Sequence, residues 1–335
     1  MGNRKRIFLV LSVALLTLVC FTAMQEDIFS AAEDIFVDVY DPARAFDGTT
    51  LLPDNHLRGK PRVIEVDMKG NIVWEYILPP GLRRYTNPGF DVEALPNNNV
   101  LLTLPGKGVY EVSRNGDEVW SYLDPKVSHD ADRLPNGNTL VVYGNDDKID
   151  DAQVKEVSPQ GRIVWAWHAK DHFNRQPYKD IFRQGWTHTN AAVRLSNGNT
   201  LISLRNFNIV VEVDPQGKVL RTIGEGVYQH QHDPEMLFGG NILVANHARP
   251  QSAEEMDPET GRIVWQFKLP DPEVWPVRDA DRLPNGNTLI TAATEIIEVT
   301  ADGDIVWQLS SGDVTFRDKE AAGLGFYKAQ RIAAH

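Results

Sequence analysis

The sequence predicts an all-β fold made of six repeats of a four-stranded unit, and three recurring features carry this prediction. The phrase Leu-Pro-Asn-Gly-Asn-Thr-Leu occupies residues 134–140 and 283–289, and altered copies occupy residues 95–101, 195–201 and 237–243. About twenty residues after each copy, a second phrase places a glycine shortly before a tryptophan. These phrases end at Trp74, Trp120, Trp165, Trp265 and Trp307, with Arg221 in the position of a sixth tryptophan. The resulting intervals of 46, 45, 56, 44 and 42 residues indicate one structural unit repeated around the chain.

Each repeat has the pattern of four short strands. Runs such as residues 139–143 and 154–157 alternate with a period of two and are rich in β-branched residues, which is typical of strands. The Asn-Gly pair between the first two strands predicts a two-residue type I′ turn. A four-stranded unit that recurs every 40–50 residues is typical of a β-propeller blade, so we predict a six-bladed β-propeller. The repeated tryptophans are expected to pack between neighbouring blades.

The C-terminal residues are expected to close this ring. Residues 327–332 (Tyr-Lys-Ala-Gln-Arg-Ile) resemble the innermost-strand phrase at residues 129–134, whereas the first repeat begins at its second strand. The C-terminal strand would therefore complete the first blade beside residues 49–52 and remove its free edge. Residues 40–44 also resemble the phrase and are the alternative, but Pro42 lacks the N–H that a central strand needs.

The N-terminus carries a targeting pattern. A basic start, residues 4–6, precedes an apolar run over residues 7–23, which predicts a secretory signal peptide or an uncleaved membrane anchor over residues 1–32. Residues 33–335 then form a single six-bladed propeller domain. We expect an extracytoplasmic protein, periplasmic or secreted, that residues 7–23 would anchor to the membrane if the segment is not cleaved.

Composition excludes several function classes. The net charge of −12 argues against nucleic-acid binding. The single cysteine, Cys20, lies in the targeting segment, so the mature chain would have no disulfide and no thiolate metal site. His230 and His232 are two residues apart on one side of a strand, a spacing that some metal sites use, but no carboxylate is clearly aimed at the same point. We therefore predict no metal and no cofactor.

The histidines indicate a functional face. Eight of the nine lie at positions where loops join blades, or join the second strand of a blade to the third. These loops share one face of a propeller, and that face is expected to carry the function. Alignment of the innermost strands gives a ring of six residues around the centre: Phe90, His129, Asn190, His232, Arg278 and Tyr327.

Further polar residues are expected at the same face. His188 precedes Asn190 by two residues, and the ends of second strands add Arg205, Asn246, His247 and Arg249. Imidazole, guanidinium and amide donors suit a compact oxyanion, so we predict a small anionic or aryl ligand in the central channel. The aspartates that follow four ring positions should alternate away from the channel into structural hydrogen bonds: Asp91, Asp130, Asp233 and Asp279.

Two resemblances to known families follow from these motifs. Residues 256–265 (Met-Asp-Pro-Glu-Thr-Gly-Arg-Ile-Val-Trp) resemble the PQQ-type propeller repeat, which is structural and does not imply the quinone cofactor. Nearly the whole mature chain resembles the arylsulfotransferase family of six-bladed propellers. The matching motifs are residues 46–52, 186–190, 231–233, 240–246, Arg249 and residues 327–332.

The second resemblance implies an activity. Enzymes of that family move a sulfuryl group from an aryl sulfate to a phenol without a nucleotide, through a histidine that attacks sulfur. His188, His232 and Arg249 resemble the sulfuryl-binding positions. The family nucleophile is expected in the last blade, yet no histidine lies between His247 and His335. Either another channel histidine, His232 or His129, attacks instead, or sulfuryl transfer has been lost.

Two main functions therefore remain open from the sequence, and a different hydrolase or a metal enzyme is the third class. One is sulfuryl transfer with His232 and His188 as catalytic residues. The other is a non-catalytic propeller that binds an anionic small ligand or serves as a scaffold for protein partners, which the sequence does not identify.

Overall fold

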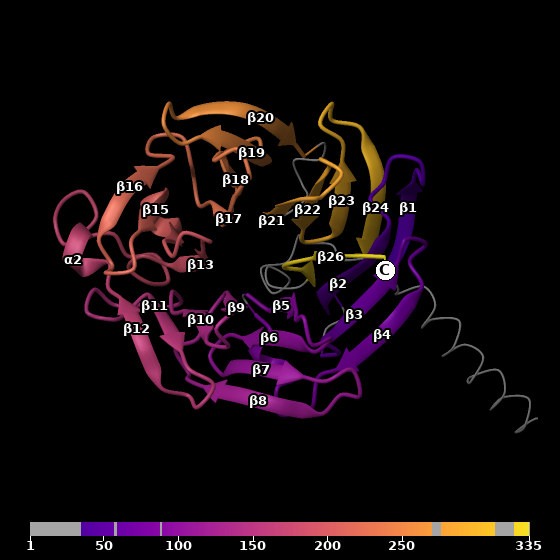
Figure 1. Cartoon of the computed structure of the whole chain (residues 1–335), viewed down its shortest axis with the longest axis horizontal. Coiled ribbons are helices and arrows are strands. Elements are labelled where there is room, and N and C mark those ends of the chain that lie inside the picture. The colour runs from indigo at the N-terminus through magenta and orange to yellow at the C-terminus, as the bar shows by residue number, and fades with distance from the viewer. Residues whose placement is uncertain (1–34, 57–58, 88, 270–275, 312–324, 335) are drawn as a thin grey trace, which may run out of the picture.

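The computed structural model describes residues 35–56, 59–87, 89–269, 276–311 and 325–334, and these form six antiparallel sheets arranged in a ring (Figure 1). The predicted signal or anchor over residues 1–32 lies outside the described residues. Among the residues described, no helix is long and apolar enough to cross a membrane.

Each blade has four antiparallel strands, ordered from the innermost, at the centre of the ring, to the outermost. The innermost strand of blade one comes from the C-terminal segment. The first three blades contain β2 (Gly48–Asn55), β3 (Arg62–Asp67) and β4 (Ile72–Ile77); β5 (Asp91–Ala94), β6 (Val100–Leu104), β7 (Gly108–Val112) and β8 (Glu118–Leu123); β9 (Ala131–Arg133), β10 (Thr139–Val142), β11 (Val154–Val157) and β12 (Ile163–Trp167). The last three contain β13 (Thr189–Arg194), β14 (Thr200–Leu204), β15 (Ile209–Val213) and β16 (Val219–Ile223); β17 (His232–Met236), β18 (Ile242–Asn246), β19 (Ser252–Asp257) and β20 (Arg262–Lys268); β21 (Val277–Arg282), β22 (Thr288–Ala292), β23 (Glu295–Val299) and β24 (Ile305–Ser311). Short helical turns lie at η1 (Arg83–Tyr85), α2 (Lys170–Phe173) and η2 (Arg205–Phe207).

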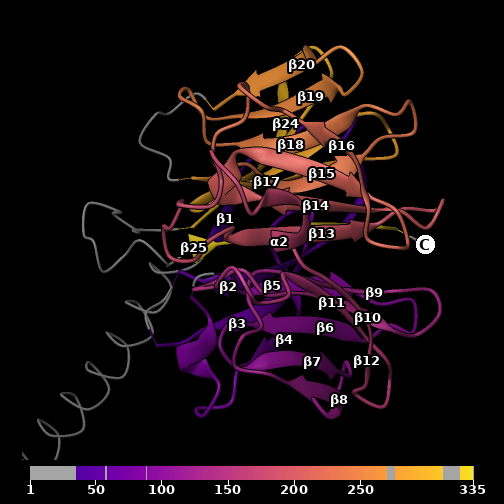
Figure 2. The ribbon, with the colours of Figure 1, turned by 90° about the vertical axis from the view of Figure 1, so that its left-hand side faces the viewer.

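The C-terminal segment closes the ring, as predicted. β26 (Gln330–Ala333) pairs antiparallel with β2 over residues 48–51, and β25 (Gly325–Phe326) pairs with Asp54 and Asn55 further along β2. Seen from the side, β25 lies toward one face of the disc and the C-terminus toward the other (Figure 2). The alternative closure fails because β1 (Ile35–Tyr40) pairs with β24, the outermost strand of blade six, and so lies far from the inner position.

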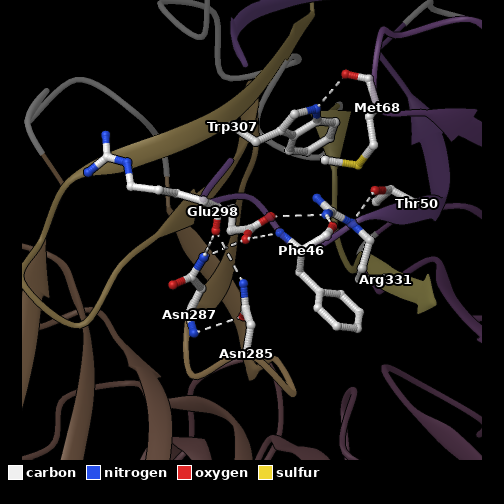
Figure 3. Close-up of polar contacts among 9 residues, drawn as sticks. Phe46, Thr50, Met68, Asn285, Asn287, Glu298, Trp307 and Arg331 are labelled. Carbon is white, nitrogen blue, oxygen red and sulfur yellow. Dashed lines mark hydrogen bonds and ion pairs between the residues drawn. The ribbon is translucent and has the colours of Figure 1, made fainter. Parts of the chain in front are cut away.

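A buried polar network fixes this closure (Figure 3). The Arg331 guanidinium pairs with the Glu298 carboxylate at 2.9 Å and donates to the Thr50 hydroxyl at 2.9 Å and to the Phe46 carbonyl. Glu298 also accepts from the Phe46 N–H at 2.7 Å and from the Asn287 amide at 2.7 Å. Phe46, just before β2, and Arg331, in the closing strand, are thus both joined to blade six through one carboxylate.

The repeated tryptophans pack between blades, as the sequence predicts. Each donates its indole N–H to a backbone carbonyl of the next blade, over 2.8–3.1 Å: Trp74 to Arg114, Trp120 to Pro159, Trp165 to Pro215, Trp265 to Ala301 and Trp307 to Met68. At each of these five junctions an arginine from the next blade lies over the tryptophan ring and pairs with a glutamate of the third strand. These sets are Trp74–Arg114–Glu65, Trp120–Arg133–Glu111, Trp165–Arg194–Glu156, Trp265–Arg282–Glu255 and Trp307–Arg331–Glu298.

The Asn-Gly turns differ from the predicted type I′ geometry. In the phrase at residues 134–140, the Gly137 N–H donates to the Leu134 carbonyl at 2.9 Å, and Gly137 has a φ of 83°. Asn136 is not among the residues with positive φ, so the turn is centred on Pro135 and Asn136 and is followed by a left-handed glycine. Proline fixes its own φ near −65°, which suits the first central position of a type I turn and excludes type I′ there.

The inner strands are irregular near the predicted ring positions. The register of the ladder shifts on either side of Asn190 in β13, after His232 in β17 and on either side of Arg278 in β21. In blade one, residues 327–329 lie between β25 and β26. Such bulges bend a strand and re-aim its side chains. The strict alternation assumed from the sequence therefore does not hold at the centre of the ring.

Candidate functional site

Four histidines and a tyrosine lie in ring-to-ring contact at the centre. The ring centroids of His129 and His188 are 4.8 Å apart, and those of His232 and His247 are 4.7 Å apart. Tyr327 joins the two pairs, because its ring centroid lies 6.2 Å from both His129 and His232. The structure thus brings together side chains from blades three, four and five and from the closing segment.

Two arginines accompany these rings. The guanidinium of Arg278 lies over the Tyr327 ring at 5.3 Å and donates to the Phe326 carbonyl at 2.8 Å. Arg205 begins η2, and its charge lowers the pKa of every histidine of the group. No ion pair among the described residues joins either arginine to a carboxylate. We call these seven residues the histidine–arginine cluster: His129, His188, His232, His247, Arg205, Arg278 and Tyr327.

Burial keeps the imidazoles of the cluster neutral. Together with nearby positive charges, it lowers the pKa of His188 to about 4 and that of His247 to about 3. The pKa values of His129 and His232 also fall well below their usual range, chiefly through burial. For His232 the next causes are the charges of His247 and Arg205. At neutral pH the positive charge of the cluster therefore comes from its arginines.

Two of these histidines have a defined tautomer. The Nδ1 atom of His188 lies 2.8 Å from the Gln184 carbonyl, and the Nε2 atom of His247 lies 2.7 Å from the Val277 carbonyl. A carbonyl only accepts, so each of these nitrogens carries the proton. The other nitrogen, Nε2 of His188 and Nδ1 of His247, then has a free lone pair.

A buried carboxylate positions His188. Asp147 accepts hydrogen bonds from the backbone N–H groups of Thr187 and His188 at 3.1 Å and from the Thr187 hydroxyl at 2.8 Å. The Asn206 amide donates to the carbonyls of the same loop at residues 183, 185 and 186. His188 itself has a φ of 46°, a strained value for a residue with a side chain, and these bonds hold it there.

The two asparagines of the predicted site have different roles. Asn246 is saturated by internal bonds, because its amide donates to Glu254 at 2.9 Å and its oxygen accepts from the N–H groups of residues 229 and 248. Asn190 donates to the Gln231 carbonyl at 2.9 Å, but its Oδ1 is buried and has no hydrogen-bond partner among the described residues. Asn190 is thus the better placed of the two to meet a ligand.

Arg249 does not join the cluster in the structure. Its side chain is exposed, and no hydrogen bond, ion pair or ring contact found among the described residues connects it to the histidines. The sequence grouped it with them because it follows the end of β18 by only three residues. Arg205, from the equivalent end of β14, approaches the imidazoles instead.

The other histidines are distributed more widely. His230 is half-buried near Arg205 and Arg183, which together with burial bring its pKa to about 4. His56 forms a buried pair with Asp54, and His172 stacks on Trp167 and bonds the Gly217 carbonyl at 3.0 Å. These last two have structural contacts, so only part of the expected histidine face is the cluster.

The four ring aspartates surround a lysine. Lys328 follows Tyr327, and its ammonium lies 3.0 Å from Asp233 and 3.9 Å from Asp91. Asp130 and Asp279 accept from the backbone N–H groups of residues 192 and 329, as predicted, yet their charges also act on Lys328. The expectation that all four are engaged in structural hydrogen bonds away from the centre therefore fails for Asp233 and Asp91, which pair with Lys328. A neighbouring cavity of about 340 Å³ includes Lys328 and Asp233 in its lining.

Over the part of the chain that the structure describes, no group of three or more His, Cys, Asp or Glu side chains is arranged to hold a metal ion. The hydrogen bonds given above engage His188 and His247 with backbone carbonyls and leave one lone pair on each.

Fold and site together define a six-bladed β-propeller with a histidine-rich centre whose positive charge is carried by arginines. The arylsulfotransferase (ASST) family model matches residues 22–237, more than half of the chain, and the protein belongs to this family. The matched segment includes His129, His188, Arg205 and His232. No curated protein sequence gives a significant match to the chain.

Solved structures confirm the fold. A protein of unknown function from Bacteroides caccae is similar with a TM-score of 0.61 and 19% identity over 84% of this chain and 98% of its own. A streptogramin B lyase follows with a TM-score of 0.52 and 12% identity, over 84% and 89% of the two chains. Virginiamycin B lyase from Staphylococcus aureus gives 0.50 and 12%, over 82% and 88%. These identities are low, so the likeness concerns the fold alone.

Proposed function

We propose that the protein transfers a sulfuryl group from an aryl sulfate to a phenol through a histidine of the cluster. The observation that carries this proposal is the combination of neutral imidazoles with two arginines, Arg205 and Arg278, that have no carboxylate partner among the described residues. A buried cation without a partner is costly, and a bound oxyanion supplies the missing charge. Membership of the arylsulfotransferase family supports the same ligand class.

His232 is the proposed nucleophile. It is neutral, because burial and the charges of Arg205 and its neighbours depress its pKa, and a neutral imidazole has the lone pair that attack on sulfur requires. In the first step the imidazole nitrogen bonds to sulfur, the sulfur–oxygen bond to the aryl group breaks, and the aryl oxide leaves. Arg205 and Arg278 stabilise the negative charge on the sulfuryl oxygens.

His188 is the proposed base of the second step. Its Nδ1–H is held by the Gln184 carbonyl, so Nε2 accepts the proton of the incoming phenol. The phenol oxygen then bonds to sulfur, the nitrogen–sulfur bond breaks, and His232 regains its neutral form. The fixed tautomer of His188 therefore favours a role as proton acceptor. The family resemblance implied instead that His188 binds the sulfuryl group.

The test is incubation of the purified protein with 4-nitrophenyl sulfate, with and without an added phenol. Release of nitrophenolate that depends on the phenol, together with a protein mass increase of one sulfuryl group without it, would support transfer. Sulfate binding without either signal would favour the alternative, a non-catalytic propeller that binds an anionic ligand. We further propose that the protein acts outside the cytoplasm, since residues 1–32 have the pattern of a signal or anchor.

A further inference from the structure

We propose that the hydroxyl of Tyr327 donates a hydrogen bond to the bound oxyanion, so that the segment that closes the ring also completes the ligand site. This inference rests on the oxyanion site of the proposed function and adds to it a ligand-binding residue and a requirement for ring closure.

Tyr327 occupies the middle of the histidine–arginine cluster. Its ring contacts both histidine pairs, through His129 and His232, and the guanidinium of Arg278 lies over its face. Arg278 also holds the preceding residue by donating to the Phe326 carbonyl at 2.8 Å. A group placed here lies beside the proposed nucleophile and beside one of the two cations.

Tyr327 lies in a short segment of the closing strand that does not pair with β2. β25 and β26 both pair with β2, but residues 327–329 between them leave the ladder. If these residues paired with β2 as a regular strand, the alternation of side chains would determine the face of the sheet to which Tyr327 points. The closing segment thus inserts Tyr327 at the position that Asn190 and Arg278 occupy in blades four and six, where the register also shifts.

The hydroxyl of Tyr327 lacks a partner within the protein. Its oxygen is buried and makes no hydrogen bond to any described residue, and the same holds for Nδ1 of the neighbouring His129. A buried polar group without a partner costs about 1–3 kcal/mol, so such groups are rare unless a ligand or water meets them. Two of them on neighbouring rings, whose centroids lie 6.2 Å apart, indicate a ligand position.

The cluster also needs a donor of this kind. His188 and His247 use their only N–H groups on backbone carbonyls, so these imidazoles offer acceptors and no donors. An oxyanion accepts hydrogen bonds only. Burial raises the pKa of Tyr327 above its usual value, so the phenol keeps its proton and remains a neutral donor.

The experiment compares three full-length proteins: wild type, Tyr327→Phe and Tyr228→Phe. Binding of inorganic sulfate is measured by isothermal titration at neutral pH and constant ionic strength, and the melting temperature is measured without sulfate. Tyr228 is the matched control, since its hydroxyl is also buried without a partner among the described residues but lies in the apolar core with Leu201 and Val244.

Tyr327→Phe should bind sulfate roughly 10–100-fold more weakly, the loss of one hydrogen bond to a charged group. Without sulfate it should melt at the wild-type temperature or above, because the change removes an unsatisfied hydroxyl and keeps the ring contacts. Tyr228→Phe should bind like the wild type. Weaker binding with undiminished stability separates loss of a ligand contact from loss of structure.

Wild-type affinity in Tyr327→Phe would overturn the role of the hydroxyl, and it would leave sulfuryl transfer by His232 untouched. Conversely, sulfate binding that depends on Tyr327 in a protein without any sulfohistidine would overturn the transferase and support the Tyr327 contact. A wild-type protein that binds no sulfate would overturn both.

Discussion

The Arg331 guanidinium and the Glu298 carboxylate form an ion pair with both side chains fully buried, at the junction between the first and the last blade. The corresponding pairs at the other junctions are partly exposed; Arg194 and Glu156, for example, have side-chain exposures of 17% and 12%. β1 packs on the outer strand of blade six and adds cover there. The arginine–glutamate ion pair is therefore most strongly desolvated at the junction where the ring is closed.

Replacing Arg331 by alanine should destabilise the protein by about 3–5 kcal/mol, because Glu298 would remain buried without its counter-charge. The free energy of unfolding in urea measures this change. Arg194→Ala is the matched control at a partly exposed junction and should cost clearly less. Equal losses in the two variants would contradict the importance of desolvation at the closure.

A chain that ends at Gly325 should lose the closed ring. It lacks β26 and Arg331, so β2 becomes a free inner edge and the Glu298 carboxylate loses its partner. We expect a sharply lower melting temperature and increased aggregation, measured by circular dichroism and light scattering. A truncated protein that melts like the full-length chain would refute closure by the C-terminal segment.

His232→Ala should abolish both nitrophenolate release and the sulfuryl adduct, since it removes the proposed nucleophile. His188→Ala should still form the adduct but slow the phenol-dependent step by roughly 10²–10⁴-fold, the contribution of one positioned acid–base group. His172→Ala, which changes a histidine stacked on Trp167, serves as the control and should retain activity. Full activity of the His232 variant would identify another histidine as the nucleophile.

The stability of the protein should depend on pH through the buried histidines. Because the pKa of His247 falls from 6.5 to about 3 on folding, the unfolded chain binds a proton first as the pH decreases below 6.5. The stabilising contribution of neutral His247 is complete above pH 6.5 and is lost progressively toward pH 3, by at most about 1.4 kcal/mol per pH unit.

Acidic residues titrate with the opposite sign, since burial raises the pKa of Glu93 and of Asp281 to about 7. The informative quantity is therefore the difference between the wild type and His247→Gln, which keeps an N–H for the Val277 carbonyl but does not titrate. Relative to this variant, the wild type should lose stability between pH 6.5 and 4. A pH-independent difference would contradict a neutral buried imidazole.

Much of the fold follows from the sequence because the information is local and repeated. The turn phrase and the tryptophan each recur five times and the glycine recurs in all six units, and the similarity of residues 327–332 to residues 129–134 identifies the closing strand. The type of turn was wrong because the preceding Pro135 decides the geometry, and proline excludes the positive φ that type I′ requires.

The site was predicted less completely, since its support is non-local. Asp147 and Asn206, which hold the His188 segment, are 41 and 18 residues away from it in sequence, and no short motif marks them. The bulges in the inner strands have no signal in the pattern, so alternation misplaced Asp233. Proximity in sequence grouped Arg249 with the histidines, whereas the chain directs it to solvent.

The ring position at the centre occurs once per blade, and each blade fills it differently, with Phe90, His129, Asn190, His232, Arg278 or Tyr327. The surrounding turns, glycines and tryptophans stay nearly constant, because every blade needs them to fold. The six repeats can therefore be compared with one another. The residues that they share maintain the fold, and the fold does not determine the residue at the positions where they differ most. A nearly symmetric scaffold thereby encloses an asymmetric centre, in which imidazole, guanidinium, amide and phenol side chains occupy equivalent positions of different blades.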